Sequence, residues 1–147
     1  MDILALGSDH AGFALKEKVK AFLETLGLKY QDFGTYSEES TDYSDYGAQV
    51  AKAVSEGTYR RAILICASGI GMSIVANKFK GVRAALCTSE VMAEYSRKHN
   101  DANILVLGGR ITDENLAKKI IKIWLDTPFE GGRHARRVNK IHQLSGL

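Results

Sequence analysis

The chain has 147 residues, of which 45% are hydrophobic and 25% are charged, and its formal net charge is +3. These values predict one globular domain spanning residues 1–147, with enough chain to bury a sizeable core. The charge excess is too small to indicate nucleic acid as a partner, and no apolar run approaches the ~20 residues of a membrane span, so we expect neither partner.

The first third of the chain is predicted to alternate buried strands with amphipathic helices. Residues 3–6 form a short apolar strand, and the following helix has apolar side chains at a 3.6-residue period until Gly27 ends it. A second strand is expected over residues 28–33. After a polar, turn-like stretch, Asp45 is expected to cap a helix that closes at Gly57.

The middle of the chain has the pattern of a strand, a glycine turn and a helix. Residues 62–65 are a continuous apolar run, as expected of a strand buried on both faces. Residues 66–71 are small and rich in glycine, and residues 72–77 can begin a helix. A fourth strand is expected over residues 82–86.

The last third repeats this alternation and ends in a helical tail. Ser89 is expected to cap a helix that stops near residues 99–100, and residues 104–107 form a fifth strand. Thr112 is expected to cap the next helix. The last amphipathic segment runs over residues 133–144.

Strands that alternate with helices at short spacing predict an α/β fold, in which a five-stranded parallel sheet is covered by helices on both faces. Ligands of such sheets bind outside the carboxyl ends of the strands. The candidate residues that this rule brings to one edge are Asp9, His10, residues 66–71, Cys87 and residues 108–110.

Cys66 stands at a strand end, directly before the glycine turn and a helix N-terminus. That environment favours thiolate and binds anions, although a cysteine at a strand end is also an ordinary buried apolar residue. Met72 occupies the position where phosphatase and rhodanese loops need arginine, and no Walker sequence closes the turn. Both of those phosphate-binding loops are therefore excluded.

Three other pairs are open to a functional or a structural interpretation. Asp9 and His10 are either ligand contacts or a helix cap with a surface histidine. His99 and Asn100 are either catalytic or an ordinary helix C-terminus. The last pair, Arg133 and Arg137, lies one helical turn apart and either grips a phosphate or belongs to a solvated basic face.

Cys66 and Cys87 form no CxxC pair and no zinc-binding spacing, and the four histidines lie far apart in the sequence. We therefore expect neither a metal nor a cofactor. The N-terminus lacks the basic leader and apolar core of a signal peptide, so a reducing cytoplasm is the expected location.

In combination, six ordered motifs closely resemble the ribose-5-phosphate isomerase type B family, which also includes galactose-6-phosphate isomerase subunits. The motifs, which span nearly the whole chain, are Ser-Asp-His-Ala-Gly at 8–12, Asp-Tyr at 42–43, Cys-Ala-Ser-Gly-Ile-Gly-Met-Ser-Ile-Val-Ala-Asn-Lys at 66–78, Arg-Lys-His-Asn at 97–100, Gly-Gly-Arg at 108–110 and Arg-His-Ala-Arg-Arg at 133–137.

The resemblance implies a Rossmann-like three-layer α/β/α sandwich and metal-free aldose–ketose isomerisation in the pentose phosphate pathway. It also implies a homodimer or tetramer with active sites at subunit interfaces. The expected reaction interconverts D-ribose 5-phosphate and D-ribulose 5-phosphate through a cis-enediolate. Two alternatives stay open: an isomerase of six-carbon sugar phosphates or rare free sugars, and a non-catalytic phosphate- or nucleotide-binding module.

The resemblance also implies residue roles. Cys66 is the expected base, Ser68 a proton relay and His99 the residue that opens the sugar ring. The amides of Ala67, Ser68, Gly69, Ile70 and Gly71 are expected to stabilise the enediolate. The expected substrate contacts are Asp9, His10, Tyr43, Asn100, Arg110, Arg133 and Arg137, of which the last two bind phosphate.

Three positions depart from the family pattern. Many members have Gly-Thr at residues 67–68, and serine keeps the hydroxyl without the methyl group. One branch lacks the cysteine and has glutamate at the position of Met72, which cannot take a proton. Many members have proline after the Asp-Tyr pair, where this chain has Ser44, which leaves that loop less restricted.

Overall fold

The structure is a computed structural model that describes residues 2–147, and five parallel strands form its middle layer. Their spatial order is β2-β1-β3-β5-β4, which confirms the predicted α/β fold with its five-stranded parallel sheet. The strands are β1 (Leu4–Ser8), β2 (Tyr30–Asp32), β3 (Ala62–Cys66), β4 (Ala84–Leu86) and β5 (Ile104–Gly108).

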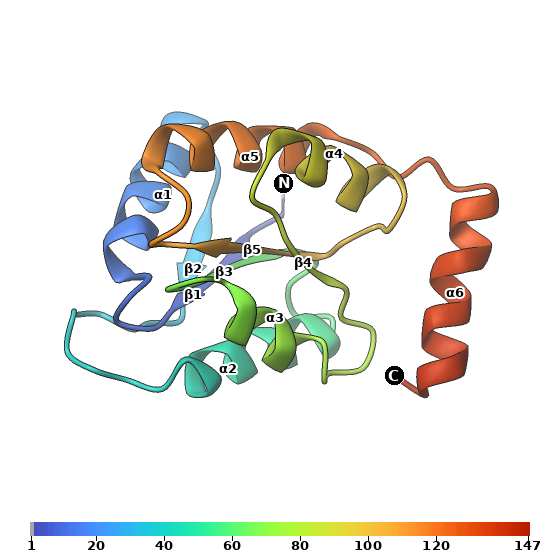
Figure 1. The fold of residues 1–147 in the computed structure, drawn as a ribbon, viewed down its shortest axis with the longest axis horizontal. Coiled ribbons are helices and arrows are strands. Elements are labelled where there is room, and N and C mark those ends of the chain that lie inside the picture. Colours follow the sequence, from blue (N-terminus) through green and yellow to red (C-terminus); the bar gives the residue numbers. More distant parts are fainter. Residues whose placement is uncertain (1) are drawn as a thin grey trace.

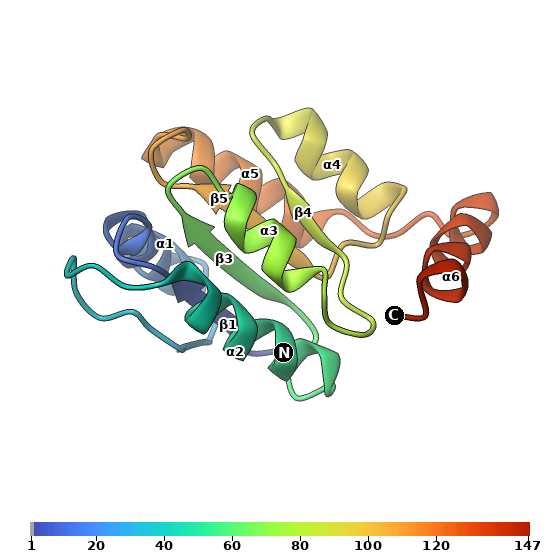
Figure 2. The same cartoon turned by 60° about the horizontal axis from the view of Figure 1, so that its bottom comes forward.

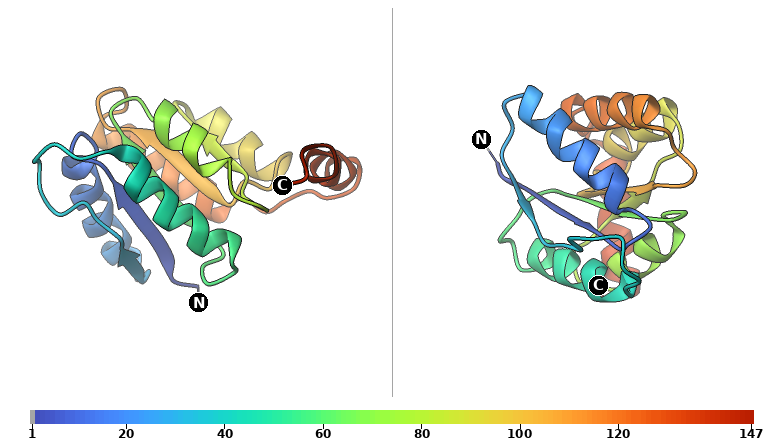
Figure 3. Two further views of the ribbon diagram at one scale, coloured as in Figure 1. Left: turned by 90° about the horizontal axis from the view of Figure 1, so that it is seen from below. Right: turned by 90° about the vertical axis from the view of Figure 1, so that its left-hand side faces the viewer.

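Helices cover both faces of the sheet. Helices α1, α4 and α5 lie on one face and α2 and α3 on the other, whereas α6 stands beside the body, beyond the edge strand β4 (Figures 1 and 3). None of the described helices is both long and apolar enough to cross a membrane. The helices are α1 (Phe13–Thr25), α2 (Tyr43–Ser55), α3 (Ile70–Ala76), α4 (Glu90–Lys98), α5 (Glu114–Asp126) and α6 (Arg133–Ser145).

Strand β3 shows why this sequence forms a three-layer sandwich. All five of its residues are buried, and successive side chains point to opposite faces of the sheet. Ile63 and Ile65 therefore join the core under α1 and α5, which also holds the fully buried Trp124. Leu64 and Cys66 join the second core, under α2 and α3.

Two helices begin at residues other than those predicted. Helix α2 begins after Asp42, so Asp45 lies in its first turn. Helix α5 is capped by Asp113, whose side chain accepts a 2.8 Å hydrogen bond from the N–H of Leu116. The predicted cap, Thr112, is buried and its Oγ1 has no hydrogen-bond partner. Both threonine and aspartate are residue types that cap helices, and here the carboxylate of Asp113 is the group that reaches the N–H of Leu116. The predicted cap at Ser89 is confirmed, because its Oγ accepts from the N–H of Met92.

The strand order places the functional edge. Strand β1 has β2 on one side and β3 on the other, and the helices that follow β1 and β3 cover opposite faces of the sheet. The loops after β1 and β3 therefore diverge at their carboxyl ends, which leaves the crevice where sheets of this kind bind ligands.

Candidate active site

Cys66 is the last residue of β3 and lies beside Gly108, the last residue of β5. Its side chain is 4% exposed. The carbonyl oxygen of Cys66 accepts a 2.7 Å hydrogen bond from the N–H of Gly109, and that of Ala67 accepts a 2.9 Å bond from the N–H of Arg110. The loops after β3 and β5 are thus joined at the thiol, and Arg110 comes to the same edge.

The turn after Cys66 needs a glycine. Gly69 has a φ of 84°, in the left-handed region that disfavours a β-carbon, and α3 begins at the next residue. The N–H of Ile70 donates a 3.2 Å hydrogen bond to Ser68 Oγ, which shapes the turn further. Met72 is fully buried in the core. The turn therefore presents Ser68 and backbone amides, while Met72 lies away from solvent.

The loop after β1 reaches the same crevice. The N–H of Asp9 donates to the carbonyl oxygen of Ile65 at 3.3 Å, and Asp9 Oδ1 accepts a 3.0 Å hydrogen bond from the N–H of Gly12. His10 Nδ1 accepts a 3.1 Å bond from the N–H of Thr41. A neutral His10 ring therefore has its proton on Nε2, which can donate to a ligand.

Tyr43 also belongs to this edge. It is the first residue of α2 and its side chain is 43% exposed. A β-carbon built on Gly71 would come within 2.7 Å of its ring, so the ring lies against the glycine turn. One chain thus brings together the candidates from four of its elements: Asp9, His10, Tyr43, Cys66, Ala67, Ser68, Gly69, Ile70, Gly71 and Arg110.

The other candidates lie at the opposite edge of the sheet. Helix α4 follows β4 and returns antiparallel to the strands, so its end at His99 lies near the start of β5 (Figure 2). A helix of nine residues covers about 13 Å along this direction. His99 and Asn100 are therefore separated from Cys66 within one chain, as are Arg133 and Arg137 on α6.

His99 is held in a stack of three rings. Its imidazole lies 4.7 Å from the ring of Tyr95 and 4.3 Å from that of His134, measured between ring centroids, with interplanar angles of 14° and 12°. Glu130 Oε1 is 3.7 Å from His99 Nε2. The stack fixes the plane of the imidazole, while the carboxylate lies beside the nitrogen that could exchange a proton.

His134 is 7% exposed, and its Nε2 has no hydrogen-bond partner among the described residues. Desolvation lowers the pKa of His134, and the charges of His99 and Arg133 lower it further. A neutral His134 places no positive charge against the ring of His99. On the same helix, the flanking Arg133 and Arg137 are exposed and available to an anion.

His99, Glu130 and His134 are also the group among residues 2–147 that could share a metal ion, since one ligand atom from each lies within 4.8 Å of the others. The two imidazoles are nearly parallel, so their nitrogen lone pairs do not converge on one point. Arg133 and Arg137 also add positive charge there. The arrangement suits an anionic ligand better than a cation.

Several residues around the two groups were missed at the level of sequence. Thr41 fixes His10, and Glu130 and His134 accompany His99. His134 stands between two candidate arginines in a quoted motif, so its position was a signal that could have been used. Thr41 and Glu130 carry no such signal, because only the folded chain brings them to their histidines.

A family model described as Ribose/Galactose Isomerase matches residues 4–141. Ribose-5-phosphate isomerase B of Escherichia coli is 48% identical over 141 residues, which cover 96% of this chain and 95% of that protein. D-erythrulose-4-phosphate isomerase of Pectobacterium atrosepticum is 42% identical over 139 residues, covering 94% and 91% of the two chains. The solved structure of Clostridium thermocellum ribose-5-phosphate isomerase B superimposes with a TM-score of 0.95 at 50% identity, and 97% of each chain is covered.

Proposed function

The chain belongs to the ribose/galactose isomerase family, and on that premise we propose that it interconverts D-ribose 5-phosphate and D-ribulose 5-phosphate. The chain is a sugar-phosphate isomerase, as are the relatives that share nearly its whole length. With that, the non-catalytic binding module is set aside.

In the proposed reaction, Cys66 thiolate takes the proton from the carbon next to the carbonyl and returns it to the neighbouring carbon. The intermediate is a cis-enediolate. Its oxygens lie against the amides of residues 67–71, and Ser68 relays protons between them. Such donors stabilise charge that exists only in the transition state and intermediate, and one donor contributes ~3 kcal/mol in other enzymes. No step in this scheme needs a metal.

The observation that carries the proposal is the placement of Cys66. Cys66 is the last residue of β3, at the point where hydrogen bonds join the loops after β1, β3 and β5 and where Asp9 and Arg110 lie. Cys87, the other cysteine, does not lie at this junction of loops, and burial raises the pKa of its thiol to about 11. A thiol that stays protonated is a poor base, so the two cysteines provide a natural comparison.

We further propose that His99, Asn100, Arg133 and Arg137 act on the sugar bound by a second copy of the chain. His99 would open the furanose ring, and the arginines would bind the phosphate. Support comes from the surface around the edge strand β4, which pairs with β5 on one side only. Unpaired edges and clustered exposed apolar side chains mark association sites. The exposed side chains flanking β4 on α3 and α4 are Ile70, Ile74, Val91, Met92 and Tyr95.

The relative from P. atrosepticum, named for a four-carbon ketose phosphate, favours a second candidate substrate. A panel of ribose 5-phosphate, erythrulose 4-phosphate and allose 6-phosphate, assayed with and without a chelator, separates pentose, tetrose and hexose preference. We expect ribose 5-phosphate to be converted fastest and the chelator to have no effect. Loss of activity on chelation would contradict the metal-free mechanism.

The role of Cys66 is tested by comparing Cys66→Ala with Cys87→Ala. Solvent deuterium should enter the reacting carbon with the wild type and with Cys87→Ala, but not with Cys66→Ala. Binding of the sugar phosphate by Cys66→Ala should stay measurable in calorimetry. A Cys66→Ala protein that turns over normally would rule out the proposed base.

A further inference from the structure

We propose that Asp101, held between Arg83 and Arg97, is a positioning residue that fixes His99 and Asn100 and joins them to helix α6. Among the described residues, Asp101 makes its side-chain hydrogen bonds and ion pairs with Arg83 and Arg97, not with residues of the crevice at Cys66 or of the ring stack. It acts through the backbone that follows α4. The inference rests on the proposed function, because it takes His99 to be the group that opens the sugar ring.

The backbone at Asp101 is unusual. Among residues 2–147 it is the non-glycine residue with a positive φ, 48°. Aspartate tolerates the left-handed region better than most residues, but the conformation still carries a cost and persists only where the surroundings impose it. Asn100 directly precedes it, so this conformation sets the direction in which the chain continues after the end of α4.

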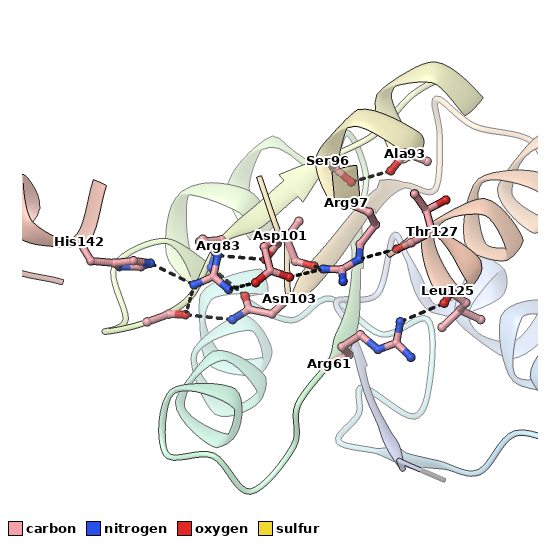
Figure 4. A network of polar contacts seen from close by, with 12 residues as sticks. Arg61, Arg83, Ala93, Ser96, Arg97, Asp101, Asn103, Leu125, Thr127 and His142 are labelled. Carbon is pink, nitrogen blue, oxygen red and sulfur yellow. Dashed lines mark hydrogen bonds and ion pairs between the residues drawn. The ribbon is translucent and has the colours of Figure 1, made fainter. Parts of the chain in front are cut away.

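Two arginines impose that conformation (Figure 4). Arg97 Nη1 donates to Asp101 Oδ1 at 2.9 Å and to the carbonyl oxygen of Ala102 at 2.7 Å. Arg83 Nε donates to the carbonyl oxygen of Asp101 at 2.9 Å, and its Nη2 lies 3.4 Å from Asp101 Oδ2. The side chains of Arg97 and Arg83 are only 12% and 20% exposed. Each arginine therefore binds both the carboxylate and the backbone of the turn.

The same network reaches α6. Arg83 Nη1 lies 3.0 Å from His142 Nε2, and since a guanidinium can only donate, the imidazole nitrogen accepts. Nearby, the N–H of Glu130 donates a 3.1 Å hydrogen bond to the carbonyl oxygen of Lys98. The first contact reaches α6 itself, and the second joins the end of α4 to the segment that leads into α6. They make His99, Asn100 and the two arginines of α6 one unit, although α6 stands apart from the body of the fold.

Such a unit matters because ring opening requires the imidazole to reach the ring oxygen and O1 of the sugar. A misplacement of about 1 Å far from the chemistry can cost ~100-fold in rate. Ribulose 5-phosphate offers a step that avoids this requirement, because its phosphorylated 5-hydroxyl cannot close a five-membered ring. Exchange of its C1 proton with solvent therefore needs Cys66 but no ring opening.

The test uses Asp101→Asn, since asparagine has nearly the same shape and also tolerates a positive φ, but lacks the charge that both arginines bind. Two rates are measured: isomerisation of ribose 5-phosphate, and deuterium exchange into ribulose 5-phosphate. We expect the ratio of the first rate to the second to fall by roughly 10- to 100-fold. The control, Arg60→Gln, removes an exposed arginine that pairs with Asp2 and should leave the ratio unchanged.

A purely structural role of Asp101 would lower both rates together, and an unchanged ratio would overturn the inference. If Asp101→Asn does not fold, Arg83→Lys makes the same test, because lysine keeps the charge and loses the Nε donor to the backbone of Asp101. If the wild-type protein showed neither activity, the proposed function would be wrong, and this inference would be wrong with it.

Discussion

The ring of Tyr43 lies against the α-carbon of Gly71, so that a β-carbon at residue 71 would stand 2.7 Å from Tyr43 Cε2 and 2.8 Å from its Cζ. The contact joins the first residue of α2 to the first turn of α3. It holds the tyrosine ring against the glycine turn even though Ser44, and not a proline, follows in the sequence.

Gly71→Ala should therefore weaken substrate binding without unfolding the protein. Tyr43 is half-exposed and can swing outward to admit the methyl group, while alanine in a helix is favoured over glycine by up to ~1 kcal/mol. Loss of one hydrogen bond to the sugar is worth about 1 kcal/mol, or a roughly fivefold rise in KM. Steady-state kinetics and the melting temperature measure the two effects.

Tyr43→Phe provides the control, because it removes the hydroxyl and leaves the ring. If Tyr43 acts as described, the double variant should raise KM no further than one single variant does. Additive losses would show that Gly71→Ala acts through something other than Tyr43.

The three-ring stack predicts opposite outcomes for two substitutions of His134. His134→Phe keeps an aromatic ring against His99, whereas His134→Ala removes it. We expect the alanine variant to lose about tenfold in isomerisation of ribose 5-phosphate, as for a misoriented catalytic group. The phenylalanine variant should keep most of the activity. Equal losses in the two variants would mean that His134 contributes more than the stack.

His134 also has a pH signature. Desolvation is the main cause that lowers the pKa of His134 in the folded chain, so the unfolded chain binds the proton more readily. The stability that depends on neutral His134 is therefore complete above the ordinary histidine value of about 6.5 and is lost as the pH falls. The melting temperature of His134→Phe should decrease less than that of the wild type between pH 7.5 and 5.5.

A buried ion pair between α1 and the edge strand β2 predicts a larger effect on stability than that of His134. Lys16 Nζ, with its side chain 1% exposed, lies 2.5 Å from Asp32 Oδ1 and 2.6 Å from the carbonyl oxygen of Thr35. Asp32 also accepts from Lys20 and from the N–H of Gly34. Asp32→Asn leaves the Lys16 ammonium without its counter-charge, which typically costs about 3–5 kcal/mol. Denaturant unfolding at neutral pH measures the loss.

The cost should shrink in acid. Burial raises the pKa of Asp32, but the hydrogen bonds from Lys16, Gly34 and Lys20 outweigh it and bring the pKa below its usual value of about 4. The stabilising effect of the carboxylate is therefore present above about pH 4 and disappears as the pH falls through the lowered pKa. The matched control is Asp126→Asn, which breaks an exposed pair with Lys122 and should cost less than ~1 kcal/mol. A constant difference between wild type and Asp32→Asn down to pH 2 would contradict this account.

The sequence was sufficient to predict the crevice at Cys66, because the carboxyl ends of parallel strands meet at one edge whatever their exact bounds. The β3 strand is one residue longer than expected and α2 begins two residues before Asp45, yet Asp9, Cys66 and Arg110 still come together. Local patterns determine the edge on which each residue lies.

The separation of His99 from Cys66 could also have been deduced, since a helix that follows a strand of a parallel sheet returns to the opposite edge. The network at Asp101 could not, because it depends on the backbone angle of one residue and on Arg83, which lies 18 residues away along the chain. Tertiary contacts of this kind have no local pattern.

Because one chain holds Cys66 and His99 at opposite edges, the proposed interface site predicts complementation between two inactive variants. Cys66→Ala and His99→Asn should each lose isomerisation of ribose 5-phosphate as homo-oligomers. In a mixed dimer, one of the two sites combines an intact Cys66 with an intact His99, whereas the other site carries both substitutions. Unfolding equal amounts together and refolding them should therefore restore about a quarter of the wild-type activity, as expected for random pairing into symmetric dimers. Each variant refolded alone is the control. If Cys66 and His99 of the same chain formed the site, the mixture would stay as inactive as its components.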